Sequence, residues 1–264
     1  MLDEETRSLI LRAYGAVSRG ASSDGHFYNE REQYLIGSHL DKNGLAGRYV
    51  FFGGYESAER KMLFALPGYC PDICEDSEEY VMSLLEDTFL SMIAILRITG
   101  SGYRELGHRD YLGSLLGLGL ERFVIGDILV RSECSSAVFF CSRKISGFIT
   151  DQLETVGSDR VSVSAVEDIS GFEPENRFVR VLGTVASNRA DSVVSSLTGM
   201  SRDEAKKAIS DGNVEVNYEK VIKAETDVAP GDTVSVRGKG KYIIRDISGT
   251  TRKGRIRLAA DRYV

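Results

Sequence analysis

Long apolar runs are absent from this sequence of 264 residues. No stretch approaches the roughly 18 apolar residues that a membrane-spanning helix needs, and the acidic start from Met1 to Glu5 lacks the apolar core of a signal peptide. We therefore expect a cytoplasmic protein with no membrane partner. The apolar fraction of 42% and the charged fraction of 27% are typical of folded domains. The length suits one large domain or two to three small ones.

Cysteine and histidine are scarce, with four and three residues. Cys70 and Cys74 form one pair and Cys134 and Cys141 a distant second one. Zinc sites usually combine two tight pairs or add histidines, and no histidine lies near either pair. We expect no metal and no other cofactor, and thiols that pack as small buried apolar groups.

The motifs of RNA-modifying enzymes are also missing. A methyltransferase needs a glycine-rich turn between a strand and a helix, which neither 15–25 nor 100–102 supplies, and no pseudouridine synthase motif surrounds a catalytic aspartate. His108-Arg109-Asp110 spells the triplet of the kinase catalytic loop, but no phosphate loop, strand lysine or Asp-Phe-Gly accompanies it. We interpret Asp110 as a residue that helps to begin a helix. The expected protein is not an enzyme, and an RNA-modifying enzyme remains the alternative.

Charge is distributed unequally along the chain. Residues 177–264 contain 17 Lys and Arg against 11 Asp and Glu, whereas residues 1–176 contain 16 against 28. The net charge of −6 is therefore the sum of a basic end and an acidic remainder. Such an asymmetry indicates a nucleic-acid surface at the basic end, although a solvated charged surface would look the same.

The middle of the chain has the rhythm of a split βαβ unit. The expected elements are a strand at 92–98, a helix at 108–120, strands at 123–131 and 137–141, a helix at 144–155 and a strand at 161–166. This βαββαβ order is that of ferredoxin-like plaits, which include RNA-recognition folds. Phe139 and Phe140 fall in the third strand, but alternation places them on opposite faces, so we expect core packing rather than base stacking. Before this unit, Glu56 to Lys61 is expected to be helical.

The basic end begins with two short helices. Asn188 is expected to cap the first helix, which Gly199 ends. Ser201 caps the second, and Glu204 completes a capping box. A helix start can hold a phosphate, which four cations would surround: Arg189, Arg202, Lys206 and Lys207.

Basic residues continue to the end of the chain. Arg237, Lys239 and Lys241 follow a short strand and are spaced by glycines. From Thr250 to Leu258 we expect a basic strand, with the cations Arg252, Lys253, Arg255 and Arg257. Alternation would place the last three on one face. Such a set would bind several phosphates with salt-dependent affinity and little sequence preference.

Residues 189–241 resemble an S4 domain, an RNA-binding module of a ribosomal protein and of several RNA-modifying enzymes. The matching pieces are Arg189-x-Asp191, Ser201-Arg202, Gly212-x-Val214-x-Val216-Asn217 and Pro230-Gly231-Asp232. The resemblance implies that the start of the second helix and the cations around it hold folded RNA. Tyr218 departs from the family, which usually has glycine after Asn217.

Further motifs extend the resemblance to the YlmH family of bacterial S4-domain proteins. They are Gly53-Gly54-Tyr55-x-x-Ala58-Glu59-Arg60-Lys61, His108-Arg109-Asp110-Tyr111-Leu112-Gly113, Leu116-Gly117-Leu118-Gly119, Gly126-Asp127-Ile128 and Thr251-Arg252-Lys253-Gly254-Arg255. The resemblance implies an α+β multidomain protein, with an N-terminal α/β domain at 1–75, an RRM-like domain at 76–178 and an S4 domain with a basic C-terminal strand at 179–264.

The same resemblance implies a protein that binds rRNA of the large ribosomal subunit, with tRNA as a further candidate. We expect the protein to be a monomer. Relatives of this kind act on large subunits that carry stalled peptidyl-tRNA, in ribosome quality control. Because genes of the family often neighbour cell-division genes, an adaptor protein in division is a third hypothesis. The acidic residues 1–176 are its one physical indication.

Overall fold

The structure is a computed structural model that describes residues 4–20, 23–73, 77–131, 135–166, 178–252 and 254–263. The chain divides into two compact units, unit 1 from Met1 to Pro174 and unit 2 from Glu175 to Val264. Both combine helices with antiparallel sheets, so the chain is an α+β protein. No helix within the described ranges is both long and apolar enough to cross a bilayer.

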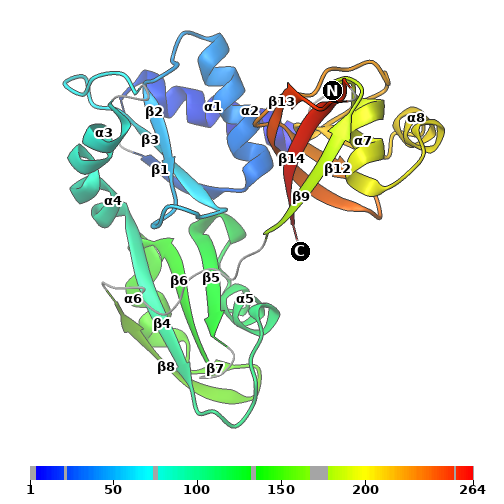
Figure 1. The fold of residues 1–264 in the computed structure, drawn as a ribbon. Coiled ribbons are helices and arrows are strands. Elements are labelled where there is room, and N and C mark those ends of the chain that lie inside the picture. Colours follow the sequence, from blue (N-terminus) through cyan, green and yellow to red (C-terminus); the bar gives the residue numbers. More distant parts are fainter. Residues whose placement is uncertain are drawn as a thin grey trace. The chain divides into compact units, whose positions relative to one another are not determined.

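Unit 1 begins with two helices that pack against a small sheet. The elements are α1 (Glu4–Ser18), β1 (Ser23–Tyr28), α2 (Glu30–Lys42), β2 (Tyr49–Phe52) and β3 (Lys61–Ala65). The strands lie in the order β1-β3-β2 (Figure 1). Asn29 and Glu32 form the capping box of α2, and Ile36 and Leu40 of that helix pack with Ile10 of α1 in one core.

The second part of unit 1 contains a five-stranded sheet. Its elements are α3 (Glu78–Leu84), α4 (Glu86–Met92), β4 (Ile93–Gly100), α5 (His108–Gly117), the 3-10 turn η1 (Arg122–Val124), β5 (Ile125–Arg131), β6 (Ser136–Ser142), α6 (Arg143–Gln152), β7 (Thr155–Val156) and β8 (Asp159–Ala165). The strands lie in the order β5-β6-β4-β8-β7. The predicted βαββαβ succession is therefore present, from β4 through α5, β5, β6 and α6 to β8 (Figure 1).

The two sheets of unit 1 share a hydrophobic core. Phe140 of β6 packs with Phe27, Phe64 and Leu129, whereas Phe139 packs on the other face with residues of α5 and α6. Both phenylalanine side chains are fully buried. Core packing of this pair, which strand alternation predicted, is confirmed, and neither ring is available for stacking on a base.

The prediction of a helix from Glu56 to Lys61 is wrong. The segment consists of turns and bends, and β3 begins at Lys61. The backbone N–H groups of Glu59 and Arg60 donate to the buried carboxylate of Asp127, at 2.7 and 3.1 Å. These donors are therefore engaged by another part of unit 1 instead of by a helical turn.

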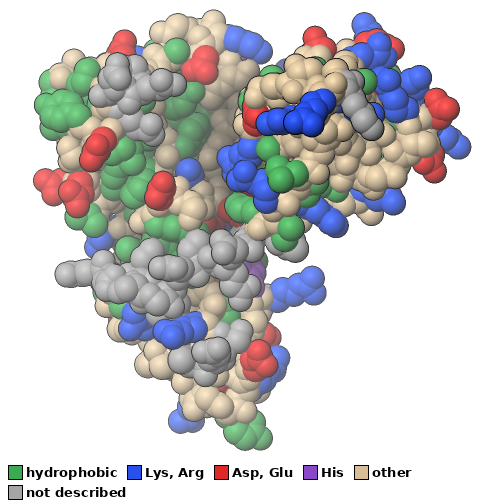
Figure 2. All heavy atoms as spheres, in the orientation of Figure 1, with side chains coloured by type: hydrophobic (Ala, Val, Ile, Leu, Met, Phe, Trp, Pro, Cys, Tyr) green, Lys and Arg blue, Asp and Glu red, His purple; other side chains and the backbone are tan. Residues whose placement is uncertain are grey.

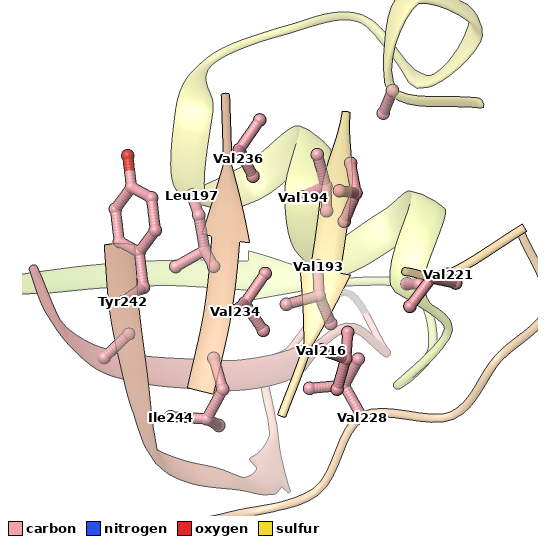
Figure 3. Close-up of a cluster of buried hydrophobic side chains, with 14 of the residues drawn as sticks. Val193, Val194, Leu197, Val216, Val221, Val228, Val234, Val236, Tyr242 and Ile244 are labelled. Carbon is pink, nitrogen blue, oxygen red and sulfur yellow. The ribbon is translucent and has the colours of Figure 1, made fainter. Parts of the chain in front are cut away.

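Unit 2 is a six-stranded antiparallel sheet with two helices on one face. Its elements are β9 (Phe178–Val185), α7 (Ala190–Thr198), α8 (Arg202–Ser210), β10 (Val214–Val216), β11 (Glu219–Lys220), β12 (Thr233–Val236), β13 (Gly240–Thr250) and β14 (Ile256–Tyr263). The strand order is β11-β10-β12-β13-β14-β9. Val193, Val194 and Leu197 of α7 point at Val234 and Ile244 of the sheet (Figure 3). We call this helix-covered side the inner face and the opposite side the outer face.

The prediction of a basic strand from Thr250 to Leu258 is wrong for the first half of that segment. Thr250 ends β13, and β14 begins at Ile256, so Arg252 and Arg255 lie in the hairpin turn. Gly254 has a φ of 74°, and the N–H of Thr251 donates to the carbonyl of Arg255. A residue in the left-handed region reverses the chain there. Consequently, strand alternation applies only from Ile256 onward.

Candidate nucleic-acid interface

The start of α7 does not use Asn188 as a cap. Arg189 occupies the cap position and makes no capping side-chain bond. The N–H groups of Ala190 and Asp191 donate to the carbonyls of Thr226 and Ala224, at 2.7 and 3.2 Å. The expected cap is wrong because a loop from later in the sequence satisfies these amides. They are therefore not open to a phosphate.

A buried carboxylate orients two of the predicted cations. Asp191 is completely buried, and Nη2 of Arg202 donates to both of its oxygens at 3.1 and 3.2 Å. Nε of Arg189 donates to the same carboxylate at 3.3 Å, and its Nη2 donates to Glu225 at 2.9 Å. The side chains of Arg189 and Arg202 keep 35% and 47% of their surface exposed. Two guanidinium groups, one from the residue before α7 and one from the first residue of α8, are thereby held side by side at the surface.

Asp191 should contribute to stability in a pH-dependent way. Burial alone would raise its pKa, but hydrogen bonds from Arg202 and Arg189 outweigh burial and lower it. The stabilisation is therefore present above about pH 4, the range of an unfolded aspartate, and is lost as the pH falls through the lower pKa of the folded protein. Asp191→Ala should reduce the opening free energy of the α7 amides in hydrogen exchange by about 2 kcal/mol at neutral pH. The exposed Asp211→Ala is the matched control, with a change below about 0.5 kcal/mol; equal effects of both would contradict this role.

The start of α8 is occupied by a carboxylate. Ser201 and Glu204 form the predicted capping box, in which Oε2 of Glu204 accepts the N–H of Ser201 at 2.8 Å. That backbone bond, the Ser201 hydroxyl and the charge of Lys239 lower the pKa of Glu204. An ionised carboxylate here disfavours a phosphate on the helix axis. A phosphate would instead approach the basic side chains of α8 from the side of the helix.

Two lysines of α8 are exposed. Lys206 lies 3.9 Å from Asp203 in a surface ion pair, and half of its side chain is exposed. Lys207 is exposed as well. Surface pairs of this kind are weak, so a phosphate can replace Asp203 as the partner of Lys206 at little cost.

A groove of about 690 Å³ lies at the end of the unit 2 sheet nearest the turn between β12 and β13. Its lining includes five cations and one carboxylate: Lys220, Arg237, Lys239, Lys241, Arg262 and Glu215. Gly240, with a φ of 127°, lets Arg262 pack closely, since a Cβ there would lie 3.2 Å from its Nε. Within the described residues, Arg237 and Arg262 form no ion pair. Figure 2 shows several Lys and Arg side chains on the surface of unit 2.

The predicted cations near the C-terminus do not form one row. Arg257 lies on the outer face of β14, and the turn residue Arg255 donates to the carbonyl of Thr184 at 2.9 Å. Arg252 is exposed in the turn, and Lys253 lies outside the described residues. Tyr263, at the groove end of β14, lies six residue steps along the strand from Arg257, which is about 20 Å. We call Arg252, Arg255 and Arg257 the hairpin cations.

Unit 1 contains a pocket of about 610 Å³ whose lining is more acidic than that of the unit 2 groove. Arg12, Arg60 and Arg122 line it together with four glutamates, Glu4, Glu5, Glu32 and Glu121. Burial and the neighbouring Arg60 lower the pKa of Arg122 to about 10. His26 stacks on Phe123 at 3.9 Å, and burial lowers its pKa. This mixture of charges does not favour a polyanion.

The other candidate residues of unit 1 have structural roles. Asp110 accepts the N–H of Gly107 at 2.9 Å at the start of α5, which confirms its interpretation as a helix-initiating residue. Cys70 and Cys141 are free, buried thiols, and burial raises the pKa of Cys141 to about 12. Cys74 and Cys134 lie outside the described residues. Among the residues that are described, no three His, Cys, Asp or Glu side chains form a group that could hold a metal.

Sequence reasoning missed three contributors to this surface. Asp191 was not assigned a function, although Arg-x-Asp at a helix start is a usable signal. Lys220 and Arg262 line the groove but are separated from the other cations in the sequence. Only the pairing of β10 with β11 and of β13 with β14 brings them there.

Comparisons with known proteins give three results. Residues 89–169 match the family model described as a putative RNA-binding domain in YlmH. The chain is 31% identical over 238 residues to the "Ribosome-associated protein quality control protein P2" of Bacillus subtilis (strain 168), an alignment that covers 89% of this chain and 85% of the relative. A solved structure named "Cell division protein ylmH from Streptococcus pneumoniae" aligns with 63% of this chain and 93% of its own, at a TM-score of 0.43 and 20% identity.

Proposed function

The chain belongs to the YlmH family, and from that premise we propose that it is a non-catalytic RNA-binding protein of the ribosome. Its target is rRNA of the large subunit, with tRNA as a second contact. It acts in the cytoplasm, as a monomer, in the quality control of stalled peptidyl-tRNA. The name of the Bacillus relative, which describes a ribosome-associated quality control protein, supports this role.

The observation that carries the proposal is the surface of unit 2. A groove lined by five cations and one carboxylate adjoins the end of α8, since Gly212 and Asn213, which follow that helix, also line it. Arg189 and Arg202 add two guanidinium groups that Asp191 orients. Because phosphates attract such clusters without regard to sequence, the arrangement suits the backbone of a folded RNA.

We further propose that unit 2 is an S4 domain with the hairpin cations appended, and that residues 76–178 form an RRM-like domain after an N-terminal domain at 1–75. The strand order β5-β6-β4-β8 supports the ferredoxin-like assignment. The buried Phe139 and Phe140 imply that this domain does not stack bases on its sheet as RNA-recognition folds commonly do. RNA contacts within 89–169 would therefore come from its helices or its edges.

Removing two cations of α8 tests the proposal. Arg202→Ala combined with Lys206→Ala should weaken co-sedimentation with large subunits several-fold, and each lost phosphate contact should make the salt dependence shallower by about one. Arg31→Ala with Lys42→Ala, two exposed cations of α2, is the charge-matched control and should leave both quantities unchanged. Co-sedimentation of the α8 variant that equals wild type across a salt series would refute the proposed contact.

The enzymatic alternative and the adaptor alternative have separate tests. If the protein modifies RNA, a modified nucleotide will appear in rRNA or tRNA only in cells that contain the intact chain. If it is an adaptor, pull-down of protein partners will survive nuclease treatment. We expect neither result.

A further inference from the structure

The outer face of the unit 2 sheet lacks the helices that cover the inner face. Val234, Tyr242 and Leu258 point to the inner core with α7 and α8. The neighbouring strand positions point outward, and they include Lys241 of β13 and Tyr263 of β14. A surface composed of strand side chains is thus open within this unit.

Aromatic rings and a cation meet at the groove end of this face. The ammonium of Lys241 lies 4.6 Å from the ring centre of Tyr263 and 5.0 Å from that of Tyr218. Phe178 of β9 contacts Tyr263 edge to face, with ring centres 4.7 Å apart. Tyr218 and Tyr263 are both half-buried, so neither residue is enclosed in the core. We call Tyr218, Lys241 and Tyr263 the tyrosine clamp.

Tyr218 has an unfavourable backbone conformation. Asn217 and Tyr218 have φ values of 50° and 64° and form the two-residue turn between β10 and β11. Such turns strongly prefer glycine at the second position, because a bulky side chain in the left-handed region is strained. Strain of this kind is concentrated at functional sites, where the side chain is needed. The Tyr218 hydroxyl accepts a hydrogen bond from Lys241 at 3.3 Å, which helps to place the ring.

Lys241 connects the clamp with the groove. It lines the groove together with Arg237, Lys239 and Arg262, and it also contacts both tyrosine rings. Cations along a backbone path combined with aromatic rings at its side are the arrangement by which proteins bind single-stranded nucleic acid. The excess of five cations over Glu215 favours a polyanion over a protein partner.

We propose that the tyrosine clamp stacks an unpaired base of RNA while the groove cations bind the adjoining phosphates. The inference rests on the proposed RNA binding and goes beyond it, because it assigns this face to a single-stranded or flipped-out nucleotide. Lys241 links the two parts of the site, because its ammonium can leave the tyrosine rings and bind a phosphate in the groove, which frees the rings for a base. A duplex, whose bases are already stacked, would bind the cations but not the clamp.

Tyr218→Gly separates stacking from stability. The variant removes the ring and relieves the strained backbone, so its melting temperature should equal or exceed that of wild type. Its affinity for a short single-stranded oligoribonucleotide should fall about ten-fold. A fluorescent adenine analogue in that strand should be quenched by wild type and not by the variant. Tyr218→Phe retains the ring and should bind and quench as wild type does.

The same strand in a blunt duplex, and intact large subunits, distinguish the possible failures. If Tyr218→Gly retains single-strand affinity within about two-fold and retains quenching, the stacking role is wrong. If the Arg202/Lys206 variant still loses binding to large subunits in that case, the proposed RNA-binding function is retained and only the stacking role is abandoned. If the wild-type chain binds neither the single strand nor large subunits, both proposals fall. Equal loss of duplex and single-strand affinity in Tyr218→Gly would also overturn the clamp, because it would indicate a purely electrostatic effect.

Discussion

Replacing Arg237, Lys239 and Arg262 together by glutamine should lower the affinity of the chain for large ribosomal subunits by about a hundred-fold at physiological salt. All three line the groove of unit 2, and the described residues provide Arg237 and Arg262 with no ion pair. Each neutralised phosphate releases counterions, so losing three contacts should reduce the slope of log affinity against log salt by about three. Co-sedimentation over a salt series measures both quantities.

The hairpin cations offer a matched control on the same sheet. Arg252, Arg255 and Arg257 changed to glutamine remove the same charge at a distance of about 20 Å along β14. We expect a smaller loss, about ten-fold, because the side chain of Arg255 is already engaged with the carbonyl of Thr184. Equal losses from both triple variants would mean that net charge, rather than the groove, determines the affinity.

Asp127→Ala should destabilise unit 1 by about 4 kcal/mol. The carboxylate is buried and accepts three hydrogen bonds, from the Tyr55 hydroxyl at 2.8 Å and from the N–H groups of Glu59 and Arg60. These donors come from the segment before β3, whereas Asp127 belongs to β5. Its removal takes away the acceptor of these three hydrogen bonds, and it loosens the junction of the two sheets.

Hydrogen exchange can localise this effect. Amides of β3 and β5 should lose protection in Asp127→Ala, whereas amides of β12 and β13 in unit 2 should not. Asp151→Ala, at an exposed position of α6, is the control and should change stability by less than about 0.5 kcal/mol. Normal protection of β3 in the Asp127 variant would show that the segment is held by other contacts.

Features that depend on neighbours in sequence were predicted correctly. The Ser201–Glu204 capping box and the role of Asp110 at the start of α5 involve residues three positions apart. The opposite orientations of Phe139 and Phe140 follow from the two-residue period of a strand. A single segment contains the information for each of these.

Features that depend on distant partners were predicted incorrectly or missed. The amides of α7 bond to the loop that contains Ala224 and Thr226, so Asn188 is not a cap. The segment from Glu56 to Lys61 bends because Asp127 binds its N–H groups. Local pattern cannot anticipate either case, since the competing acceptor lies more than 30 residues away in the sequence.

The sequence by itself determined the membership of a family, the basic character of the C-terminal end and most of its cations. These properties are sums or short motifs, and they do not require coordinates. Only the tertiary structure decided which cations act together. Pairing of β13 with β14 brings Arg262 and Tyr263 to Lys241, while the glycine turn at Gly254 keeps the hairpin cations at the other end. Antiparallel pairing joins residues about twenty positions apart and separates near neighbours, which is why the basic end contains two surfaces rather than one.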